Sequence, residues 1–336
     1  MQIIIPMAGK GKRMRPHTLT TAKPLIHVAG KPVVQRLVED ITKVCGQKVN
    51  EIAFVISPDF GAEVEKDLIK VAESQGAKGS IYYQEVALGT AHAIMCAKEA
   101  IKGKTVVAFA DTLFKADFVM DTEKEGVIWV QKIDDPSQFG VVKLNAQGSI
   151  TDFIEKPGTF ISDLAIIGIY YFKDGDYLKS ELQYLLDNDI KEKGEYQLTN
   201  ALENMKQKGT QFVPGQVTEW LDCGNKNATV YTNQRVLEFN KGKAELKGKN
   251  IVQNNSVIIE PCYIGDGVEI QNSIVGPHVS IGANTKISGS IIQNSIVQAS
   301  VKLTNAHVQN SMIGIGAEVS GKALDLSISD YTQIIA

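Results

Sequence analysis

The chain repeats itself within Ile264-Gly-Asp-Gly-Val-Glu-Ile-Gln-Asn-Ser-Ile-Val-Gly-Pro-His-Val-Ser-Ile-Gly282, where the pair Ile-Gly returns after 17 residues. Aliphatic anchors recur every five or six positions, at Ile258, Ile264, Ile270, Val275, Ile281, Ile287, Ile292, Val297, Leu303, Val308 and Ile313. A period near six, with three short strands per turn, predicts a parallel β-helix of triangular cross-section. The alternative is an ordinary β-sandwich, which would need strict alternation and longer turns.

Composition separates this repeat from the rest of the chain. Residues 251–336 hold 25 isoleucines and valines but only 9 charged residues. One aliphatic side chain per strand is expected to point inward, with Gly and Asn at the corners, and 17 residues per coil predicts about five coils. The preceding stretch 239–250 is polar and punctuated by glycine, which is typical of a linker. We therefore expect a first domain over 1–238, a linker over 239–250 and a left-handed β-helix over 251–336.

The first 238 residues alternate short apolar runs with helical patterns. Strands are expected over 3–6, 51–57, 80–84 and 105–111, and helical spacing lies between them at 34–44, 64–71 and 90–101. That order predicts an α/β fold with a doubly wound, mostly parallel, Rossmann-like sheet. Further strands are expected near 127–132, 139–144 and 166–172, and helices near 177–189 and 198–208.

Charge and cysteine content exclude several classes of protein. The 336 residues carry 35 Lys and Arg against 38 Asp and Glu, so no basic excess favours nucleic acid or an anionic membrane. The apolar run at 3–8 is too short for a signal peptide or a spanning helix. The four cysteines lie far apart without metal or disulfide spacing, which fits a reducing cytoplasm.

Chemistry is expected where strands end, because ligands of open α/β sheets bind beyond the carboxyl ends of the strands. The first strand runs into Met7-Ala-Gly-Lys-Gly-Lys-Arg-Met-Arg-Pro16, whose glycines let backbone N–H groups approach an anion while four cations crowd the loop. It is neither a dinucleotide fingerprint nor a Walker loop, and a Lys-rich surface turn would give the same pattern.

Four further strand ends carry polar groups. Gln84, followed by Leu88-Gly-Thr-Ala91, offers an amide and an exposed backbone that can pair with a nucleobase. Asp111 and Asp222 supply two carboxylates, which together suit Mg²⁺. Glu155-Lys156 adds one charge of each sign. Taken singly, each is equally explained as a cap, a turn residue or a solvated ion pair.

In combination these motifs resemble the sugar-1-phosphate nucleotidyltransferases along nearly the whole chain. The resemblance rests on motifs that arrive in the family's order: Gly9-Lys-Gly-Lys-Arg13, Thr18-Leu-Thr-Thr-Ala-Lys-Pro-Leu25, Gly30-Lys-Pro32, Gln84 with Leu88-Gly-Thr-Ala91, Asp111, Phe139-Gly-Val-Val142, Glu155-Lys-Pro157, Gly168-Ile-Tyr170, Glu195-Tyr-Gln-Leu-Thr199 and Trp220-Leu-Asp222. At Leu164-Ala-Ile-Ile-Gly168 the chain is most similar to the long glucose-1-phosphate thymidylyltransferases. Lys12 and Asn200 depart from the family, where Thr and Asp are common.

The resemblance implies a function and a set of sites. The reaction would join an NTP to a sugar 1-phosphate and release pyrophosphate, with Mg²⁺ as cofactor and a homo-oligomer formed through the β-helix. The implied roles are as follows: Arg13, Lys23 and Lys156 for catalysis; Ala8, Gly9, Gly11, Gln84, Gly89 and Thr90 for the nucleotide; Gly140, Glu155, Lys156 and Gly168 for the sugar phosphate; Asp111 and Asp222 for the metal.

Base and substrate choice follow less directly. Thymine and uracil present acceptor, donor and acceptor along their pairing edge, which the Gln84 amide and the Gly89 main chain can complement, so dTTP or UTP with glucose 1-phosphate is expected. The alternatives are a GTP-dependent mannose-1-phosphate guanylyltransferase, a bifunctional enzyme whose β-helix transfers acyl groups through His278 or His307, and a non-catalytic subunit that senses nucleotide sugars.

Overall fold

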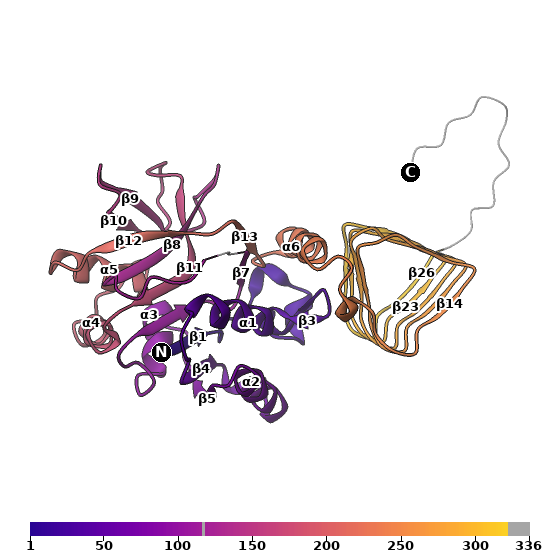
Figure 1. Cartoon of the computed structure of the whole chain (residues 1–336), viewed down its shortest axis with the longest axis horizontal. Coiled ribbons are helices and arrows are strands. Elements are labelled where there is room, and N and C mark those ends of the chain that lie inside the picture. The colour runs from indigo at the N-terminus through magenta and orange to yellow at the C-terminus, as the bar shows by residue number, and fades with distance from the viewer. Residues whose placement is uncertain (116–117, 322–336) are drawn as a thin grey trace. The chain divides into compact units, whose positions relative to one another are not determined.

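The computed structural model describes residues 1–115 and 118–321. The chain divides into two compact units, the first made of Met1–His27 with Lys31–Thr232 and the second of Val28–Gly30 with the chain from Asn233 onward. Figure 1 labels their elements along the chain. Each unit has a sheet architecture of its own and is described separately.

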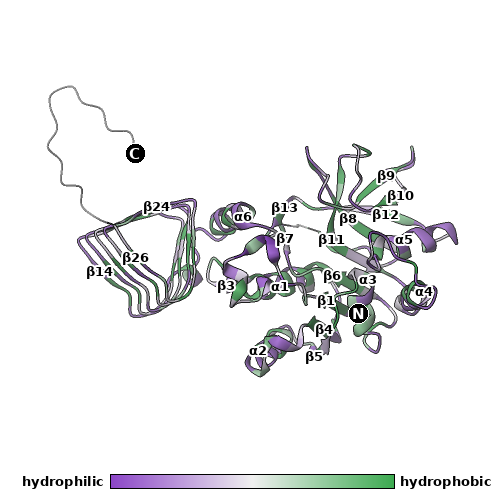
Figure 2. Ribbon diagram, turned by 180° about the vertical axis from the view of Figure 1, so that it is seen from behind, coloured by the Kyte–Doolittle hydropathy of each residue, from purple (hydrophilic) through white to green (hydrophobic). Residues whose placement is uncertain are grey.

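The first unit is organised around a nine-stranded sheet in which seven strands follow the order β10-β9-β11-β6-β1-β4-β5. Its strands are β1 (Gln2–Pro6), β4 (Glu51–Ile56), β5 (Lys78–Tyr83), β6 (Thr105–Ala108), β8 (Gly126–Lys132), β9 (Val141–Leu144), β10 (Ile150–Ile154), β11 (Leu164–Phe172) and β12 (Phe212–Gln216). The strands β6, β1, β4 and β5 are parallel. Every residue of β1 and β4 is buried, and Figure 2 shows these strands in the hydrophobic colour. Strands covered on both faces need such unbroken apolar runs.

The described residues form six α-helices and five short 3-10 helices, and the sequence predicted five of the α-helices. They are α1 (Val33–Cys45), α2 (Ala62–Ser74), α3 (Thr90–Cys96), α4 (Gly175–Asp187), α5 (Leu198–Gln207) and α6 (Lys226–Phe239), with short 3-10 helices η1 (Lys12–Met14), η2 (His17–Leu19), η3 (Lys23–Leu25), η4 (Pro58–Phe60) and η5 (Ala244–Leu246). In α1 the apolar residues at helical spacing are buried. The helix expected over 90–101 stops at Cys96, because the chain from Ala97 turns through successive i→i−3 bonds that are too tight for an α-helix.

The second half of the sheet is antiparallel at its centre. Strand β11 pairs antiparallel with β6, β8 and β9, whereas β12 runs parallel to β8. The pairing of β11 with β8 shifts register between Ile166 and Tyr170, so Gly168 sits at an irregularity of the strand. Four short strands form two further two-stranded sheets. β2 (His27–Val28) pairs with β3 (Lys31–Pro32), and β7 (Thr112–Lys115) pairs with β13 (Glu219–Asp222).

The second unit contains the predicted β-helix. Three stacked parallel sheets hold β14 (Val252–Asn254), β17 (Glu269–Gln271), β20 (Lys286–Ser288), β23 (Lys302–Thr304) and β26 (Glu318–Ser320); β15 (Val257–Ile258), β18 (Ile274–Val275), β21 (Ile291–Gln293) and β24 (His307–Gln309); and β16 (Cys262–Ile264), β19 (Val279–Ile281), β22 (Ile296–Val297) and β25 (Met312–Ile313). Figure 1 shows the coils stacked in parallel. The left-handed β-helix and the α/β class of the first unit are thereby confirmed.

Side chains in the β-helix follow the predicted stacking. Ile270, Ile287 and Leu303 are register partners and almost completely buried. Corner residues adopt left-handed backbone, among them Asn255 at φ 42° and Asn272 at φ 48°. Leu246, from the stretch expected to be a linker, is also buried. Residues 322–336 of the predicted repeat segment lie outside the described residues.

Candidate active site

The loop after β1 provides backbone and cations for an anion. Gly11 has φ 56°, and the Thr18 hydroxyl donates to its carbonyl oxygen over 2.8 Å. Met14 is buried and anchors η1, while Arg13 beside it is exposed. A Cβ atom on Gly9 would meet no protein atom within 4 Å, so the space beside this backbone is open. The loop therefore leaves room for a ligand against its main chain.

Gln84 follows β5 and lies at the same edge of the sheet. Its backbone N–H donates to the carbonyl of Ile56, and its side chain is 8% exposed. Gly89 faces it across a tight loop, with φ 116°. A Cβ atom on Gly89 would lie 2.4 Å from the carbonyl oxygen of Tyr196, so both the backbone angle and the close approach require glycine.

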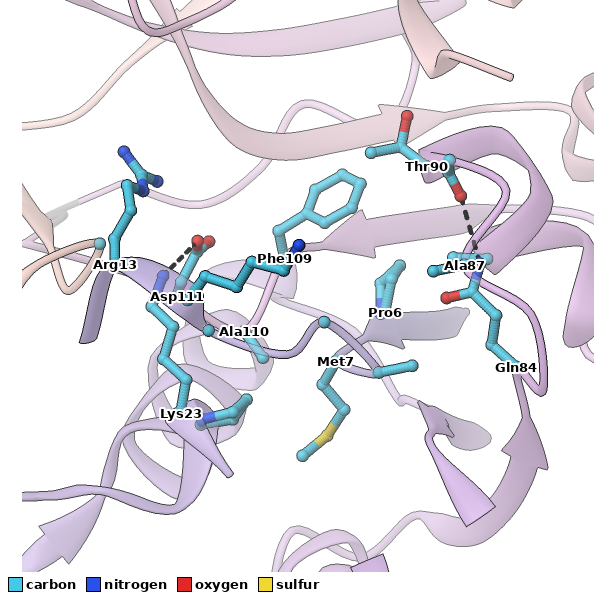
Figure 3. Close-up of a pocket in the computed structure, with 18 of the residues that line it drawn as sticks. Pro6, Met7, Arg13, Lys23, Gln84, Ala87, Thr90, Phe109, Ala110 and Asp111 are labelled. Atoms are coloured by element: carbon cyan, nitrogen blue, oxygen red, sulfur yellow. Dashed lines mark hydrogen bonds and ion pairs between the residues drawn. The ribbon is translucent and has the colours of Figure 1, made fainter. Parts of the chain in front are cut away.

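Two carboxylates meet where β7 pairs with β13. Asp222 is the register partner of Thr112, and the Cys223 N–H donates to the Asp111 carbonyl over 2.9 Å. Lys23 Nζ lies 2.7 Å from Asp111 Oδ2, an ion pair whose lysine side chain is only 11% exposed, as Figure 3 shows. Burial, and then the negative charge of Asp111, raise the pKa of Asp222. The charges of Lys23 and Arg13 act in the opposite direction on the pKa of Asp222 but do not cancel the effects of burial and Asp111.

A second group of residues comes from β10, β11 and the loop before β9. Lys156 Nζ lies 3.5 Å from Glu155 Oε1, and the Thr199 hydroxyl donates weakly to Glu155 Oε2 over 3.4 Å. Gly140 has little free space, since a Cβ there would lie 3.2 Å from Glu155 Oε2. Burial, followed by the charges of Glu155 and Asp111, raises the pKa of Tyr170, so its hydroxyl stays protonated.

These residues line two adjoining cavities. The first, of about 420 Å³, is lined by all the predicted nucleotide residues and by Arg13, Lys23 and Asp111. The second, of about 200 Å³, is lined by Gly140, Glu155, Lys156, Gly168 and Asp222. Arg13, Thr90, Phe109 and Asp111 line both cavities. Every predicted site residue therefore lies in the first unit, at one continuous site.

Several residues that shape this site had no role assigned to them from the sequence. Phe109 lines both cavities and packs edge-on against Tyr170, with 6.1 Å between ring centroids. Phe139 and Trp220 form another edge-on pair in the second cavity. His92 contacts Gln84 from α3, behind the cavity wall. Aromatic residues and a helical histidine are common in cores, so nothing in their spacing distinguished them from packing residues.

The described residues set limits on other chemistry. Within 1–115 and 118–321, no three or more His, Cys, Asp and Glu side chains converge into a metal cluster. Two carboxylates are consistent with Mg²⁺, which fills its shell with water and substrate phosphate. In the same described ranges, every helix is too short or too polar to cross a membrane.

Comparison with solved structures shows a shared fold. The chain matches a UDP-glucose pyrophosphorylase complexed with UDP-glucose at a TM-score of 0.58, covering 71% of this chain and 98% of the other. At 20% sequence identity this likeness shows the fold alone.

Sequence comparison then gives the family. The family model described as Nucleotidyl transferase matches residues 2–238. The chain is 28% identical to a glucose-1-phosphate thymidylyltransferase of Streptomyces antibioticus, over 95% of this chain and 94% of the other. It is 29% identical to the bifunctional protein GlmU of Methanococcus vannielii, over 94% and 78%. The chain belongs to the nucleotidyl transferase family, among its sugar-1-phosphate nucleotidyltransferases.

Proposed function

We propose that this enzyme transfers a nucleotidyl group from dTTP or UTP to glucose 1-phosphate, with release of pyrophosphate and dependence on Mg²⁺. The observation that carries the proposal is the shared wall of the two cavities. Arg13 and Asp111 line both cavities: the first, which is lined by the glycine-rich loop after β1, and the second, which is lined by Lys156. A group bound in one cavity therefore meets a group bound in the other beside a cation and a carboxylate.

The choice of substrates rests on chemistry and likeness together. Gln84 and Gly89 offer uncharged hydrogen-bonding groups at the end of the first cavity, which suits the imide edge of thymine or uracil. Glu155 and the confined backbone near Gly140 suit sugar hydroxyls, and Lys156 suits the phosphate. A glucose-1-phosphate thymidylyltransferase is among the relatives that match over nearly the whole chain.

The residues at β7 and β13 fit a magnesium ion. Asp111 and Asp222 line the second cavity, and each carries an oxygen ligand of the kind Mg²⁺ prefers. The raised pKa of Asp222 reflects burial beside a like charge, which a divalent cation would relieve. When bound, Mg²⁺ would neutralise charge on the reacting phosphates.

The chain's own groups then account for the reaction. An oxygen of the sugar phosphate forms a bond to the α-phosphorus, the bond from that phosphorus to the β-phosphate oxygen breaks, and pyrophosphate leaves with the electron pair. The attacking phosphate has a second pKa of about 6, so it needs no general base at neutral pH. Arg13 and Lys23 offset negative charge on the triphosphate, and Lys156 holds the attacking phosphate in place. Lys23 has to exchange its partner Asp111 for phosphate when substrate binds.

Acyl transfer by the β-helix has less support. His278 Nε2 is bonded to Glu238 Oε1 at 2.5 Å, and its side chain is 17% exposed, so the ring already has a structural partner. His307 is exposed in register with Ile291 on the outer face of a sheet. We therefore propose that the β-helix serves the assembly of a homo-oligomer. We also propose that the enzyme is cytoplasmic, in keeping with its four free cysteines.

The test combines each of four NTPs and dTTP with glucose, galactose, mannose and glucosamine 1-phosphates in turn. Pyrophosphate release is measured for every combination. We expect the highest kcat/KM for dTTP or UTP with glucose 1-phosphate, and no release in excess chelator. A tenfold preference for GTP with mannose 1-phosphate would make the enzyme a guanylyltransferase. Pyrophosphate release only after thiol release from acetyl-CoA with an amino-sugar phosphate would favour the bifunctional alternative.

A further inference from the structure

The amide of Gln84 is held in one orientation by two partners. Its Nε2 donates to the Gly89 carbonyl over 3.3 Å and lies 3.1 Å from Nδ1 of His92. A carbonyl oxygen can only accept, so the amide nitrogen, and not the oxygen, must face Gly89. The assignment of this amide therefore follows from its surroundings.

The same logic fixes the proton on His92. The amide nitrogen can only donate, so Nδ1 of His92 must be the unprotonated, accepting nitrogen, and the ring proton resides on Nε2. Burial lowers the pKa of His92, which favours the neutral ring that this contact requires. His92 lies on α3 and is absent from the cavity lining, so it reaches Gln84 from behind.

With both N–H groups of the amide engaged, its oxygen is what remains for a ligand. Gln84 lines the first cavity, and Figure 3 shows the amide oxygen turned toward Pro6 while the nitrogen meets the loop that follows. An acceptor that lies opposite the ring nitrogen at the middle of a pairing edge requires an N–H there, whereas at the end of that edge it could also accept from an exocyclic amine. Uracil and thymine carry one at N3 and guanine at N1, whereas cytosine N3 and adenine N1 are bare acceptors.

We infer that His92 is a positioning residue for base selection: together with the Gly89 carbonyl it accepts from Gln84 and keeps the amide oxygen opposite the ring nitrogen of the base, so the site takes bases with a ring N–H and rejects cytosine and adenine. The inference rests on the proposed function in placing the base beside Gln84. It goes further by naming His92 as the residue that determines which end of the Gln84 amide faces the base. UTP and CTP are the sharpest pair of probes, since they differ only along the pairing edge.

The test uses the full-length protein with Mg²⁺ and measures direct binding of UTP and CTP by calorimetry, alongside kcat/KM for both. His92→Leu removes the acceptor, and we expect the UTP to CTP binding ratio to fall about threefold to tenfold, the value of one neutral hydrogen bond. The change should appear in KM rather than kcat for UTP. His92→Asn carries an acceptor oxygen at the δ position and should restore most of the ratio.

His307→Leu, the same chemical change in the second unit, serves as the matched control and should leave the ratio unaltered. The inference is overturned if wild-type protein binds CTP as tightly as UTP, if no nucleotide binds, or if His92→Leu folds normally and keeps the wild-type ratio. Selective UTP binding without pyrophosphate release would instead contradict the proposed function and leave the inference about His92 intact.

Discussion

At the scale of single residues, charges gather at the wall between the two cavities. Arg13 is exposed there and lines both, while Lys23 is tied to Asp111 at 2.7 Å. The Arg13 charge acts mainly on bound substrate, because an exposed cation contributes little to packing. Substitution of Arg13 should therefore affect turnover much more than folding.

Arg13→Ala tests this separation directly. We expect kcat/KM to fall about 10²- to 10⁵-fold, the cost of removing a charge-neutralising group in phosphoryl transfer, while the melting temperature stays nearly unchanged. Lys10→Ala is the control, since Lys10 belongs to the same loop but lines a different cavity. A variant that unfolds yet remains active per folded molecule would show that Arg13 serves the fold.

The two aspartates should behave as one unit. Asp111→Asn and Asp222→Asn should each raise the Mg²⁺ concentration for half-maximal activity and lower kcat, and the double variant should lose much less than the product of the two effects. The measurement is a magnesium titration of initial rate for all four proteins. Full additivity, or activity in excess chelator, would contradict a shared ion.

Gly9 offers a test of where the ligand lies. A methyl group on Gly9 would touch no protein atom, and the same holds for Gly158, which lies outside both cavities. We expect Gly9→Ala to fold normally but to raise the KM for NTP at least tenfold, because the methyl group would occupy the space of the phosphates. Gly158→Ala should match wild type. Equal kinetics in both variants would place the phosphates elsewhere.

At the scale of elements, the pairing of β7 with β13 brings together segments more than a hundred residues apart. Thr112 Oγ1 donates to the Ile167 carbonyl over 2.7 Å, and this bond attaches the start of β7 to β11. The Asp111 and Asp222 backbones are thereby fixed by hydrogen bonds rather than by a flexible loop. Such support is what a site of defined geometry needs.

Helix α1 carries a stability prediction that depends on pH. Burial, opposed by Arg36 and aided by Glu39, raises the pKa of Asp40 to about 6. The native state then holds this proton between about pH 4 and 6, where the unfolded chain has lost it, so Asp40 lowers stability as pH rises through 6. Asp40→Asn should therefore add about 1–3 kcal/mol to the unfolding free energy at pH 7 and little near pH 4. Urea denaturation at both pH values measures this.

Asp59→Asn, at an exposed position, provides the comparison for Asp40. It should change stability equally at the two pH values. If Asp40→Asn also gives a pH-independent change, the carboxyl of Asp40 titrates normally in the native protein and the prediction is wrong.

Elements differed in how far their residues predicted them. The apolar runs of β1 and β4 located both strands to within a residue or two, because strands buried on both faces leave little choice of side chain. Strands β10 and β12 were not predicted, since β10 places Thr151 and Asp152 between its apolar residues and β12 contains Pro214 and Gly215. The site residues lie together because strand order and pairing bring them together; their positions at strand ends indicated a common edge, and the family resemblance indicated their roles. The contact between His92 and Gln84 depends on tertiary geometry that no local pattern contains.

At the scale of the molecule, the β-helix presents an exposed aliphatic column. Val257, Ile274 and Ile291 are register partners on successive strands of one sheet and are 55%, 39% and 40% exposed. An aligned apolar row on a flat sheet face suits a second copy of the chain, and we propose that it forms the homo-oligomer interface. Charge on this row should then disrupt assembly.

The double variant Ile274→Lys with Ile291→Lys should convert the oligomer to a monomer, measured by size-exclusion chromatography with light scattering at micromolar concentration. Gln271→Lys adds a lysine at an exposed position of another sheet and should leave the mass unchanged. A wild-type monomer, or an oligomer that survives both lysines, would rule out this face.

Transfer of a nucleotidyl group onto a sugar phosphate is tested most directly by following a phosphorus label from UTP into the products. UTP labelled with ³²P at the α-phosphate and, separately, at the γ-phosphate is incubated with glucose 1-phosphate, Mg²⁺ and enzyme. We expect the α label to appear in a nucleotide sugar and the γ label in pyrophosphate, and the two labelled products to form in equal amounts. Label released as orthophosphate, or α label that never joins the sugar, would contradict it.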